Sequence, residues 1–264
     1  MISNQFNNIK GLIIDMDGVL WHDTEPLGDL PMIFAHIRKQ GFRFILATNN
    51  ATRTVQEYHE KLAGFGVELE EGQVINAAEG VGIYLSERKP KGTTVFVVGQ
   101  PSLKRTLEAY GLRVVDSDHN EASIVVASLD YSLTYDKLKQ ASLLIQSGAE
   151  FIGTNPDVTL PTPVGFIPGS GTVIGALEIA SGKKAKIIGK PEPLLYEMAL
   201  KRLDLSPDRT LAIGDRLETD IAGAHAAGIH TALVLSGAST LEQAEHHHPR
   251  PEVIVKDLTE LLFR

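Results

Sequence analysis

Two aspartates separated by one residue follow an apolar run near the N-terminus. Residues 11–14 are Gly-Leu-Ile-Ile, and Asp15, Met16, Asp17 and Gly18 come directly after them. The apolar run predicts a buried strand, and Gly18 favours a turn after it. Two carboxylates about 4 Å apart repel each other by about 4 kcal/mol at an effective dielectric of about 20, so the pair favours a bound cation or a shared proton. An Asp-x-Asp-Gly turn also occurs on protein surfaces without a ligand, and this pattern alone leaves both readings open.

Three other predicted strands also end in polar side chains. These are Thr48, Asn49 and Asn50 after strand 42–48, Lys190 after strand 186–188, and Asp215 after strand 210–214, with Asp220 in the first turn of the next helix. Each has an ordinary alternative, because Thr48 and Asp220 could cap helices and Lys190 could be solvated. The carboxyl ends of parallel strands meet at one edge of a sheet, where ligands bind. We therefore expect these side chains to gather there.

The combined set of side chains favours phosphoryl transfer. Several carboxylates suit Mg²⁺, which prefers hard oxygen ligands, while a hydroxyl and an ammonium can hold phosphate. A carboxylate beside bound magnesium can accept a phosphoryl group as an aspartyl phosphate, and a second carboxyl can exchange protons with the leaving group and water. The Gly-x-x-x-x-Gly-Lys-Ser/Thr sequence of a P-loop is absent.

Composition narrows the protein class and its partners. The chain has 264 residues, 43% of them hydrophobic, which is typical of a globular protein with a sizeable core. A net charge of -8 without a long basic run argues against a nucleic acid polymer as partner. There is no cysteine, so disulfides and thiolate ligands are excluded. No apolar stretch approaches the roughly 20 residues that span a bilayer, and the N-terminus lacks a signal-peptide core, so we expect no membrane contact and a cytoplasmic location.

Short Val/Ile/Leu-rich runs alternate with helical periodicity along the chain, which predicts an α/β fold with a doubly wound parallel sheet. The helix near residues 30–40 shows the pattern clearly, with Asp29 as its expected cap. Strands are predicted at 11–15, 42–48, 94–98, 124–127, 150–154, 186–188, 210–214 and 231–235. Helices are predicted at 54–65, 77–88, 100–110, 134–146, 171–181, 192–202 and 219–227. Turn-rich stretches at 87–92 and 180–184 predict a core of residues 1–85 and 184–264 with an inserted smaller α/β domain at 86–183.

The order and spacing of the four motifs resemble those of the haloacid dehalogenase-like hydrolases over essentially the whole chain. The matching segments are 15–19, 48–50, Lys190, and 214–215 with Asp220. The resemblance implies Asp15 as nucleophile, Asp17 as general acid and base, and Thr48 and Lys190, with Asn49 and Asn50 beside them, as the phosphate site. It also implies that Asp15, Asp215 and the backbone carbonyl of Asp17 bind magnesium, with Asp220 supporting the metal.

The position of the insert is similar to that of the class IIA branch, in which a large α/β cap follows the threonine motif. Residues 189–191 and 154–157 look like the same branch, which includes p-nitrophenyl phosphatase-like, sugar phosphate and nucleotide phosphatases. The resemblance implies a magnesium-dependent phosphatase for a small phosphorylated metabolite, whose cap closes over the site. Caps can also carry dimer surfaces, so a homodimer is possible.

Two other kinds of protein could carry part of this set of acidic, threonine and lysine side chains. A signalling receiver also has acidic residues, a threonine and a lysine around a phosphorylated aspartate, but it has little use for an insert of this size and for Asp17. A catalytically idle phosphate-binding protein on the same fold is the second alternative.

Three minor features of the sequence each allow more than one interpretation. Residues 165–172 could be a phosphate loop or a structural turn, and residues 246–248 could be a metal-binding tract or a solvated loop. Trp21 and His22 could contact substrate, pack in the core or form a hairpin.

Overall fold

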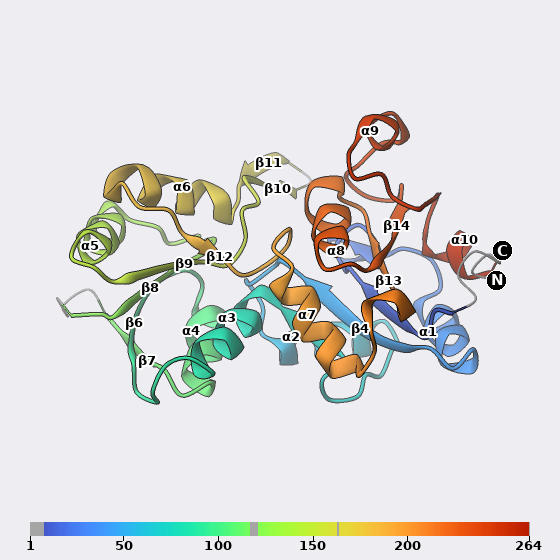
Figure 1. Ribbon diagram of the computed structural model, residues 1–264, viewed down its shortest axis with the longest axis horizontal. Coiled ribbons are helices and arrows are strands. Elements are labelled where there is room, and N and C mark those ends of the chain that lie inside the picture. The colour runs from blue at the N-terminus through green and yellow to red at the C-terminus, as the bar shows by residue number, and fades with distance from the viewer. Residues whose placement is uncertain (1–7, 117–120, 163, 264) are drawn as a thin grey trace. The chain divides into compact units, whose positions relative to one another are not determined.

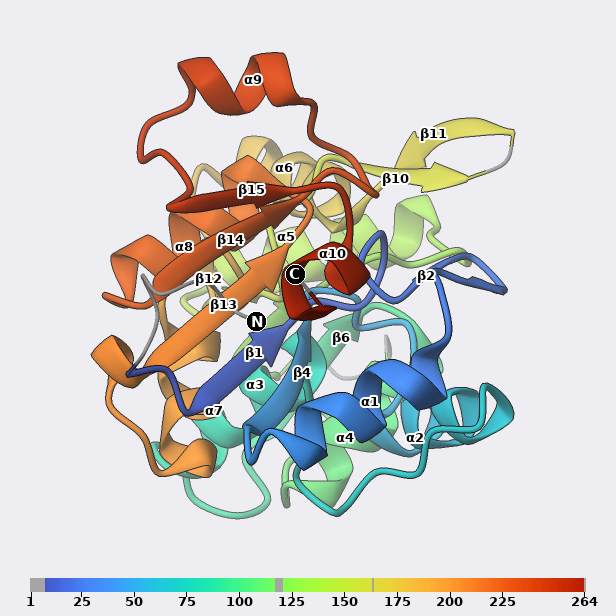
Figure 2. The same ribbon diagram turned by 90° about the vertical axis from the view of Figure 1, so that its right-hand side faces the viewer.

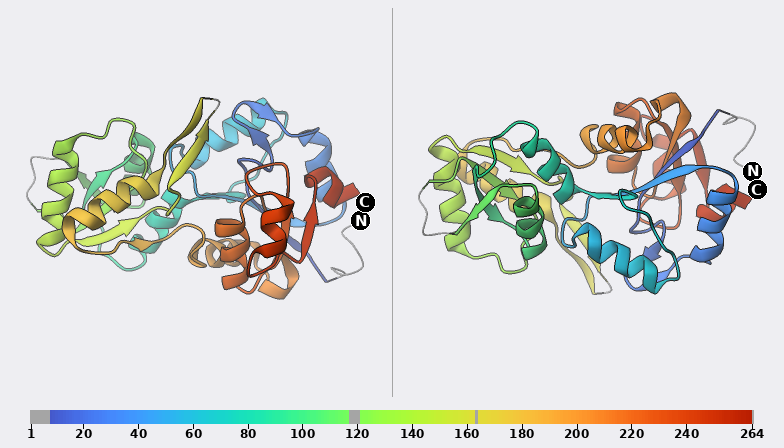
Figure 3. Two further views of the ribbon diagram at one scale, coloured as in Figure 1. Left: turned by 90° about the horizontal axis from the view of Figure 1, so that it is seen from above. Right: turned by 90° about the horizontal axis from the view of Figure 1, so that it is seen from below.

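The computed structural model describes residues 8–116, 121–162 and 164–263 and divides into two compact units (Figure 1). The first unit consists of Met1–Thr48, Gln56–Ile75 and Lys190–Arg264, and the second of Asn49–Val55 and Asn76–Gly189. The blue strand β1 and the red helix α10 both belong to the first unit (Figures 2 and 3). The predicted α/β class with parallel sheets is confirmed.

A six-stranded sheet with the order β15-β14-β13-β1-β4-β5 forms the centre of the first unit. Its strands are β1 Gly11–Ile14, β4 Arg43–Thr48, β5 Val74–Asn76, β13 Thr210–Gly214, β14 His230–Val234 and β15 Val253–Val255. Strand β1 is parallel to both neighbours, and Ile14 pairs with Ile213 of β13 and with Leu46 of β4. Strands β1 and β13 are buried along their whole length, as continuous apolar runs predict for a sheet covered on both faces. The ends of β1, β4 and β13 therefore lie side by side.

Helices cover both faces of this sheet, with α7 and α8 on one side and α1 and α10 on the other (Figure 2). The helices of this unit are α1 Leu30–Lys39, α2 Val55–Gly64, α7 Leu194–Leu203, α8 Ala222–Ala226, α9 Leu241–His246 and α10 Leu258–Phe263. Helix α1 begins as predicted, because the Asp29 carboxylate accepts a hydrogen bond from the Met32 amide at 2.9 Å.

The second unit has its own five-stranded parallel sheet, with the order β12-β9-β8-β6-β7. Its strands are β6 Thr94–Val98, β7 Arg113–Val115, β8 Ile124–Ala127, β9 Glu150–Gly153 and β12 Lys186–Ile187. Helices α3 Ala77–Ser86 and α4 Pro101–Ala109 pack together, as do α5 Tyr135–Gln146 and α6 Ser170–Ser181 (Figure 1). Phe96, Val125, Phe151 and Leu177 form part of its buried core.

Two short antiparallel hairpins complete the fold. Strands β2 Trp21–His22 and β3 Glu25–Pro26 pair just after the first aspartate motif, which confirms the hairpin considered for Trp21 and His22. Strands β10 Thr159–Thr162 and β11 Gly165–Pro168 pair in the second unit. Among the helices of the described residues, none combines the length and the apolar composition that crossing a bilayer requires.

The boundaries between the two units do not lie at the turn-rich stretches 87–92 and 180–184, where composition predicted them. The turn at 87–92 connects α3 to β6, and Gly182 ends α6 with a left-handed φ of 70°, so both are ordinary turns inside the second unit. Helix α3 belongs to the second unit because it packs on α4, where Gly82 leaves room for the Tyr110 ring.

The prediction that strand 186–188 belongs to the core sheet is wrong. Strand β12 pairs with β9 of the second unit, where Ile187 packs against the core cluster of that sheet. Lys190 therefore begins the segment that returns to the first unit, instead of ending one of the first unit's strands.

Candidate active site

Three buried carboxylates gather at the ends of the central strands of the first unit. Asp15 follows β1 and Asp215 follows β13, and the pairing of Ile14 with Ile213 brings these two positions to the same edge. One oxygen from each of Asp15, Asp215 and Asp220 lies within 4.8 Å of the other two. Like charges at this separation repel strongly in a buried site, so the group requires compensating positive charge.

Asp220 is placed by an unusual turn. The helix predicted at 219–227 is split into a π-helical turn, Leu217–Ile221, and α8, because Asp220 Oδ2 accepts a hydrogen bond from the Arg216 amide at 3.0 Å. The Tyr196 hydroxyl donates to the Asp220 carbonyl oxygen at 3.0 Å. Gly214 is required for this packing, since a Cβ there would lie 2.2 Å from the Asp220 Cβ.

Lys190 supplies positive charge directly to the acidic group. Its Nζ donates to Asp15 Oδ1 at 2.5 Å, to Asp220 Oδ1 at 2.6 Å and to the Ala47 carbonyl oxygen at 3.0 Å. The side chain is 2% exposed, which excludes the solvated lysine considered from the sequence. Burial alone would lower the pKa of Lys190, but attraction to Asp15 and Asp220 holds the pKa well above its ordinary value, so the amine stays charged.

One ammonium does not neutralise three carboxylates. Burial raises the pKa of Asp15 well above its ordinary value, and the charges of Asp220 and Asp215 add to this against the opposing attraction of Lys190. Burial, followed by repulsion from Asp220, raises the pKa of Asp215 to about 7. Fully ionised, the three carboxylates and Lys190 carry a charge of -2, which a divalent cation would balance.

The site fits a divalent metal on chemical grounds. Asp215 Oδ2 accepts a hydrogen bond from the Ala238 amide at 2.7 Å, but Oδ1 is buried without a hydrogen-bond partner. A buried carboxylate oxygen left unpaired is costly unless it binds a cation. Both oxygens of Asp220 already accept hydrogen bonds, from Lys190 and from the Arg216 amide, so Asp15 and Asp215 are the stronger candidates for direct ligands.

Asp17 and Thr48 flank this group. Asp17 lies in the turn after β1, and its exposed side chain accepts a hydrogen bond from the indole Nε1 of Trp21 at 2.8 Å. Thr48 is buried as the last residue of β4. Helix α2 begins only at Val55, so Thr48 does not cap a helix.

Asn49 and Asn50 belong to the second unit, where their side chains support local structure. Asn49 Nδ2 donates to Asp157 at 3.3 Å, and Asn50 Oδ1 accepts hydrogen bonds from the amide and the hydroxyl of Thr52. A role for these two asparagines in phosphate binding stays a prediction.

The minor sequence features have structural explanations. In the segment 165–172, a Cβ on Gly169 would lie 2.3 Å from the Asp157 carbonyl oxygen, and one on Gly171 would lie 2.2 Å from that of Pro156. These glycines therefore allow close packing of two backbone segments. Among the residues described, the acidic trio is the one group of three or more histidine, aspartate or glutamate side chains close enough to share a metal, and the histidines at 246–248 are not part of it.

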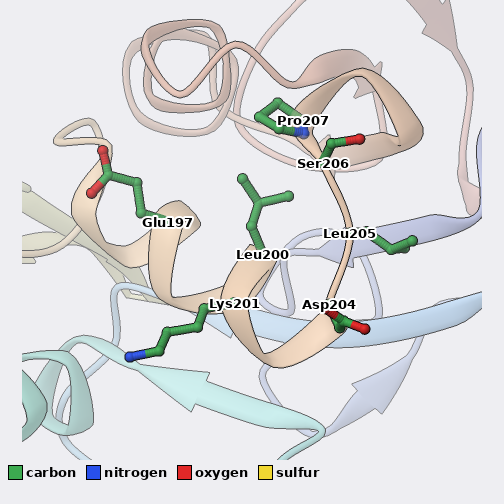
Figure 4. Close-up of a pocket in the computed structure, with 7 residues that line it drawn as sticks. All are labelled: Glu197, Leu200, Lys201, Asp204, Leu205, Ser206 and Pro207. Carbon is green, nitrogen blue, oxygen red and sulfur yellow. The ribbon is translucent and has the colours of Figure 1, made fainter.

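A shallow pocket of about 430 Å³ lies elsewhere on the first unit (Figure 4). It is lined by the end of α7 and the loop after it: Glu197, Leu200, Lys201, Asp204, Leu205, Ser206 and Pro207. None of the predicted site residues contributes to it.

Sequence reasoning missed the residues that hold the carboxylates in place. Tyr196 lies on α7 and gave no signal apart from helical periodicity, and Ala238 acts through its backbone amide, which no residue type reveals. Trp21 stands out in the sequence by its position just after the aspartates, but the sequence does not reveal its hydrogen bond to Asp17.

Comparisons with known proteins show the family to which the chain belongs. Residues 12–113 match the family described as haloacid dehalogenase-like hydrolase, and residues 187–261 match a family described as HAD-hydrolase-like. An acid sugar phosphatase of Staphylococcus aureus (strain MRSA252) is 33% identical over 253 residues, which cover 96% of each chain.

Solved structures show the same similarity. The crystal structure of a 4-nitrophenylphosphatase from Thermotoga maritima has a TM-score of 0.92 and 32% identity, with 99% of each chain covered. That of a glycerol phosphate phosphatase from Mycobacterium tuberculosis in complex with magnesium has a TM-score of 0.89 and 33% identity, covering 96% of this chain and 76% of that one. The chain therefore belongs to the haloacid dehalogenase-like hydrolases, within the class IIA branch of p-nitrophenyl phosphatase-type phosphatases.

Proposed function

We propose that the protein is a magnesium-dependent phosphatase that hydrolyses small phosphomonoesters through an aspartyl phosphate on Asp15. The observation that carries this proposal is the buried trio of Asp15, Asp215 and Asp220 with the Lys190 ammonium bonded into it. Such a site combines a nucleophile, ligands for a hard cation and a positive charge for phosphate.

Asp15, Asp215 and the backbone carbonyl of Asp17 would hold the magnesium, with Asp220 anchoring Lys190 beside it. Bound magnesium would supply positive charge that offsets the repulsion between the carboxylates and the phosphate dianion and polarises the phosphoryl group. The magnesium complex of the glycerol phosphate phosphatase and the unpaired Asp215 Oδ1 support this assignment.

The reaction would proceed in two displacements. An Asp15 carboxylate oxygen attacks phosphorus, the ester P–O bond breaks, and the Asp17 carboxyl gives its proton to the leaving oxygen. Asp17 then takes a proton from a water molecule as that water attacks the aspartyl phosphate, which releases inorganic phosphate and regenerates Asp15. Thr48 and Lys190 would bind the phosphoryl oxygens throughout, the latter by turning a donor from Asp15 toward phosphate.

The natural substrate is expected among small phosphorylated metabolites. The relatives are named for sugar phosphates, glycerol phosphate and 4-nitrophenyl phosphate, and we propose the same range here, with nucleotides added, rather than a nucleic acid polymer. The second unit would act as the cap that selects among these esters. A cytoplasmic location and a homodimer stay predictions of the sequence.

Turnover of p-nitrophenyl phosphate with magnesium tests the proposed function. We expect many turnovers per enzyme, loss of activity in excess EDTA, and a phosphoenzyme that survives acid quenching. Asp15→Asn should remove both turnover and phosphoenzyme, because the amide cannot attack phosphorus. Asp208→Asn, at an exposed position of the same unit, is the matched control and should behave as wild type. Release of no more than one equivalent of nitrophenol would instead indicate a receiver-like protein, and no release an idle binder.

A further inference from the structure

Trp21 is fully buried and donates its indole Nε1–H to the Oδ1 of Asp17 at 2.8 Å. A backbone hydrogen bond joins the same two segments, because the Gly18 amide donates to the Trp21 carbonyl oxygen at 2.8 Å. A buried ring thus anchors an exposed carboxylate four residues earlier, on the turn that leaves β1.

The indole ring is itself held by residues of the first unit. Tyr58 stacks on it with ring centroids 6.5 Å apart, and Phe65 packs at 5.9 Å. The Lys61 ammonium lies 4.0 Å from the indole centroid and donates to the Asp23 carbonyl oxygen at 2.7 Å, so one lysine ties α2 to both the ring and the β2–β3 hairpin. With contacts to its face and its edge, the ring has little freedom to turn.

This arrangement has two physical consequences for Asp17. An exposed aspartate ordinarily samples several rotamers, and a hydrogen bond from a fixed donor restricts it to one. A cation on the face of an indole also draws electron density from the ring, which strengthens the N–H as a donor to a carboxylate.

We propose that Trp21, with Lys61 on its ring, is the positioning element that holds Asp17 in the orientation required for proton transfer. The inference rests on the proposed function, because it assigns to Asp17 the exchange of protons with the leaving oxygen. Misplacement of a reacting group by about 1 Å can cost roughly 100-fold in rate.

The hydrogen bond can be tested without any activity measurement, because the chain contains a single tryptophan. A ¹H–¹⁵N spectrum therefore shows one indole resonance. We expect Asp17→Asn to move this resonance upfield, since an amide oxygen accepts more weakly than a carboxylate. Asp23→Asn is the matched control within the same hairpin, at a position whose φ of 50° asparagine tolerates, and it should leave the resonance in place. Equal shifts in both variants, or none in either, would show that the indole does not bind Asp17.

The effect on catalysis is read from kcat/KM for two leaving groups. Trp21→Phe removes the donor and should lower kcat/KM for an alkyl phosphate by about 10- to 100-fold, but for p-nitrophenyl phosphate by no more than about 3-fold, because nitrophenolate needs no proton to leave. Lys61→Met should also lower kcat/KM for both esters, by smaller factors than Trp21→Phe does. The matched control Phe65→Leu loosens the same packing and keeps the donor, so it should change both substrates equally.

A double-mutant comparison separates positioning from general loosening. If Trp21 acts through Asp17, then adding Trp21→Phe to Asp17→Asn should cost no further activity. A further loss similar to that in wild type, or a Trp21→Phe variant that lowers both substrates as Phe65→Leu does, would overturn the proposal while leaving the phosphatase function intact. If Trp21→Phe does not fold, Lys61→Met and the indole spectrum decide. A wild-type protein that hydrolyses no ester would contradict the proposed function instead, and the indole resonance would still decide whether Trp21 holds Asp17.

Discussion

Lys190 has to interact both with carboxylates and with phosphate. In the structure it neutralises Asp15 and Asp220, while the proposed reaction requires it to attract a phosphate dianion. Both needs are met if a divalent cation takes over part of the neutralisation, because one ammonium donor can then turn toward phosphate.

We predict that Lys190→Met weakens the binding of vanadate by on the order of 100-fold and lowers turnover by at least as much, since it removes a buried cation that faces an anion. The measurement is vanadate inhibition of p-nitrophenyl phosphate hydrolysis, with thermal unfolding as a check on the fold. Lys201→Met, an exposed lysine on α7, is the control and should bind vanadate normally. Unchanged vanadate affinity in Lys190→Met would show that the lysine serves structure alone.

The raised pKa of Asp215 predicts how the metal-free protein responds to pH. The folded-state pKa of Asp215 is about 7, above the ordinary value of 3.8. Between pH 3.8 and pH 7, Asp215 is therefore protonated in the folded protein and ionised in the unfolded chain. Stability contributed by this proton is present at low pH and is lost as the pH rises toward 7, at about 1.4 kcal/mol per unit. Magnesium replaces the proton, and its effect should grow over the same window.

We therefore expect the melting temperature in EDTA to be lower at pH 7.5 than at pH 5.5, and the rise on adding magnesium to be larger at pH 7.5. Differential scanning fluorimetry at both pH values measures this. Asp215→Asn removes the titrating group and should reduce the pH dependence as well as the response to magnesium. A magnesium shift of the same size at both pH values would contradict metal binding by Asp215.

The sequence was informative about Asp15, Asp215 and Lys190 because each carries a charge next to an apolar run, and such charges are stable only near partners. It was silent on Tyr196 and on the Ala238 amide, whose roles depend on tertiary contacts. Lys190 lies beside Asp15, as its position after an apolar run predicted, but the strand before it belongs to the sheet of the other unit and not to the sheet that carries Asp15.

The turn after β13 sets the geometry of the acidic group. Gly214 lets the chain of Leu217–Ile221 approach closely enough for Asp220 to reach Lys190. We predict that Gly214→Ala lowers stability by at least about 2 kcal/mol and also lowers magnesium affinity, because its Cβ would overlap Asp220 in a packed region. Urea unfolding and a magnesium titration measure the two effects.

Gly175→Ala is the matched control for this substitution. Gly175 lies inside α6 with no neighbour within 4 Å of an added Cβ, so alanine should stabilise the helix by roughly 0.5–1 kcal/mol. Wild-type stability and normal magnesium binding in Gly214→Ala would contradict this prediction. That result would show that the turn tolerates a Cβ at position 214.

Long elements with a clear period were predicted well, whereas several of the shortest elements were missed. Helix α1 shows both its buried face and its Asp29 cap in the sequence. Strands β5, β7 and β15 have three residues each, which is too few to establish a period. The π-helical turn at Leu217–Ile221 depends on a contact from Asp220 back to the Arg216 amide, so it reads as the start of a helix.

The boundary between the two units depends on packing rather than on composition. The second unit takes in residues 49–55, which follow directly on Thr48, as well as helix α3. Linker-like sequences at 87–92 and 180–184 mark turns within that unit, because glycine and proline serve turns of every kind. Contacts between distant segments, which a single sequence does not show, decide where the division falls.

The discontinuous second unit allows a test of its proposed role as a cap. Asp15, Thr48, Lys190, Asp215 and Asp220 all belong to the first unit, whose sheet and core contain none of the residues from 77 to 188. Replacing residues 77–188 with a short Gly/Ser linker should therefore leave the acidic group together. We predict that the shortened protein still binds magnesium and hydrolyses p-nitrophenyl phosphate slowly, while its kcat/KM values for natural esters fall toward one low value, since contacts to the leaving group are lost.

The decisive comparison is the spread of kcat/KM across a panel of sugar phosphates, glycerol phosphates and nucleotides, measured for the full chain and the shortened one. Circular dichroism and magnesium binding first establish that the shortened protein is folded. Asp15→Asn in the shortened protein is the control, and it should abolish the residual hydrolysis, because the chemistry resides in the first unit. If the folded, shortened protein ranked the esters as the full chain does, selection would reside in the first unit, and the second unit would have a role other than choosing the substrate.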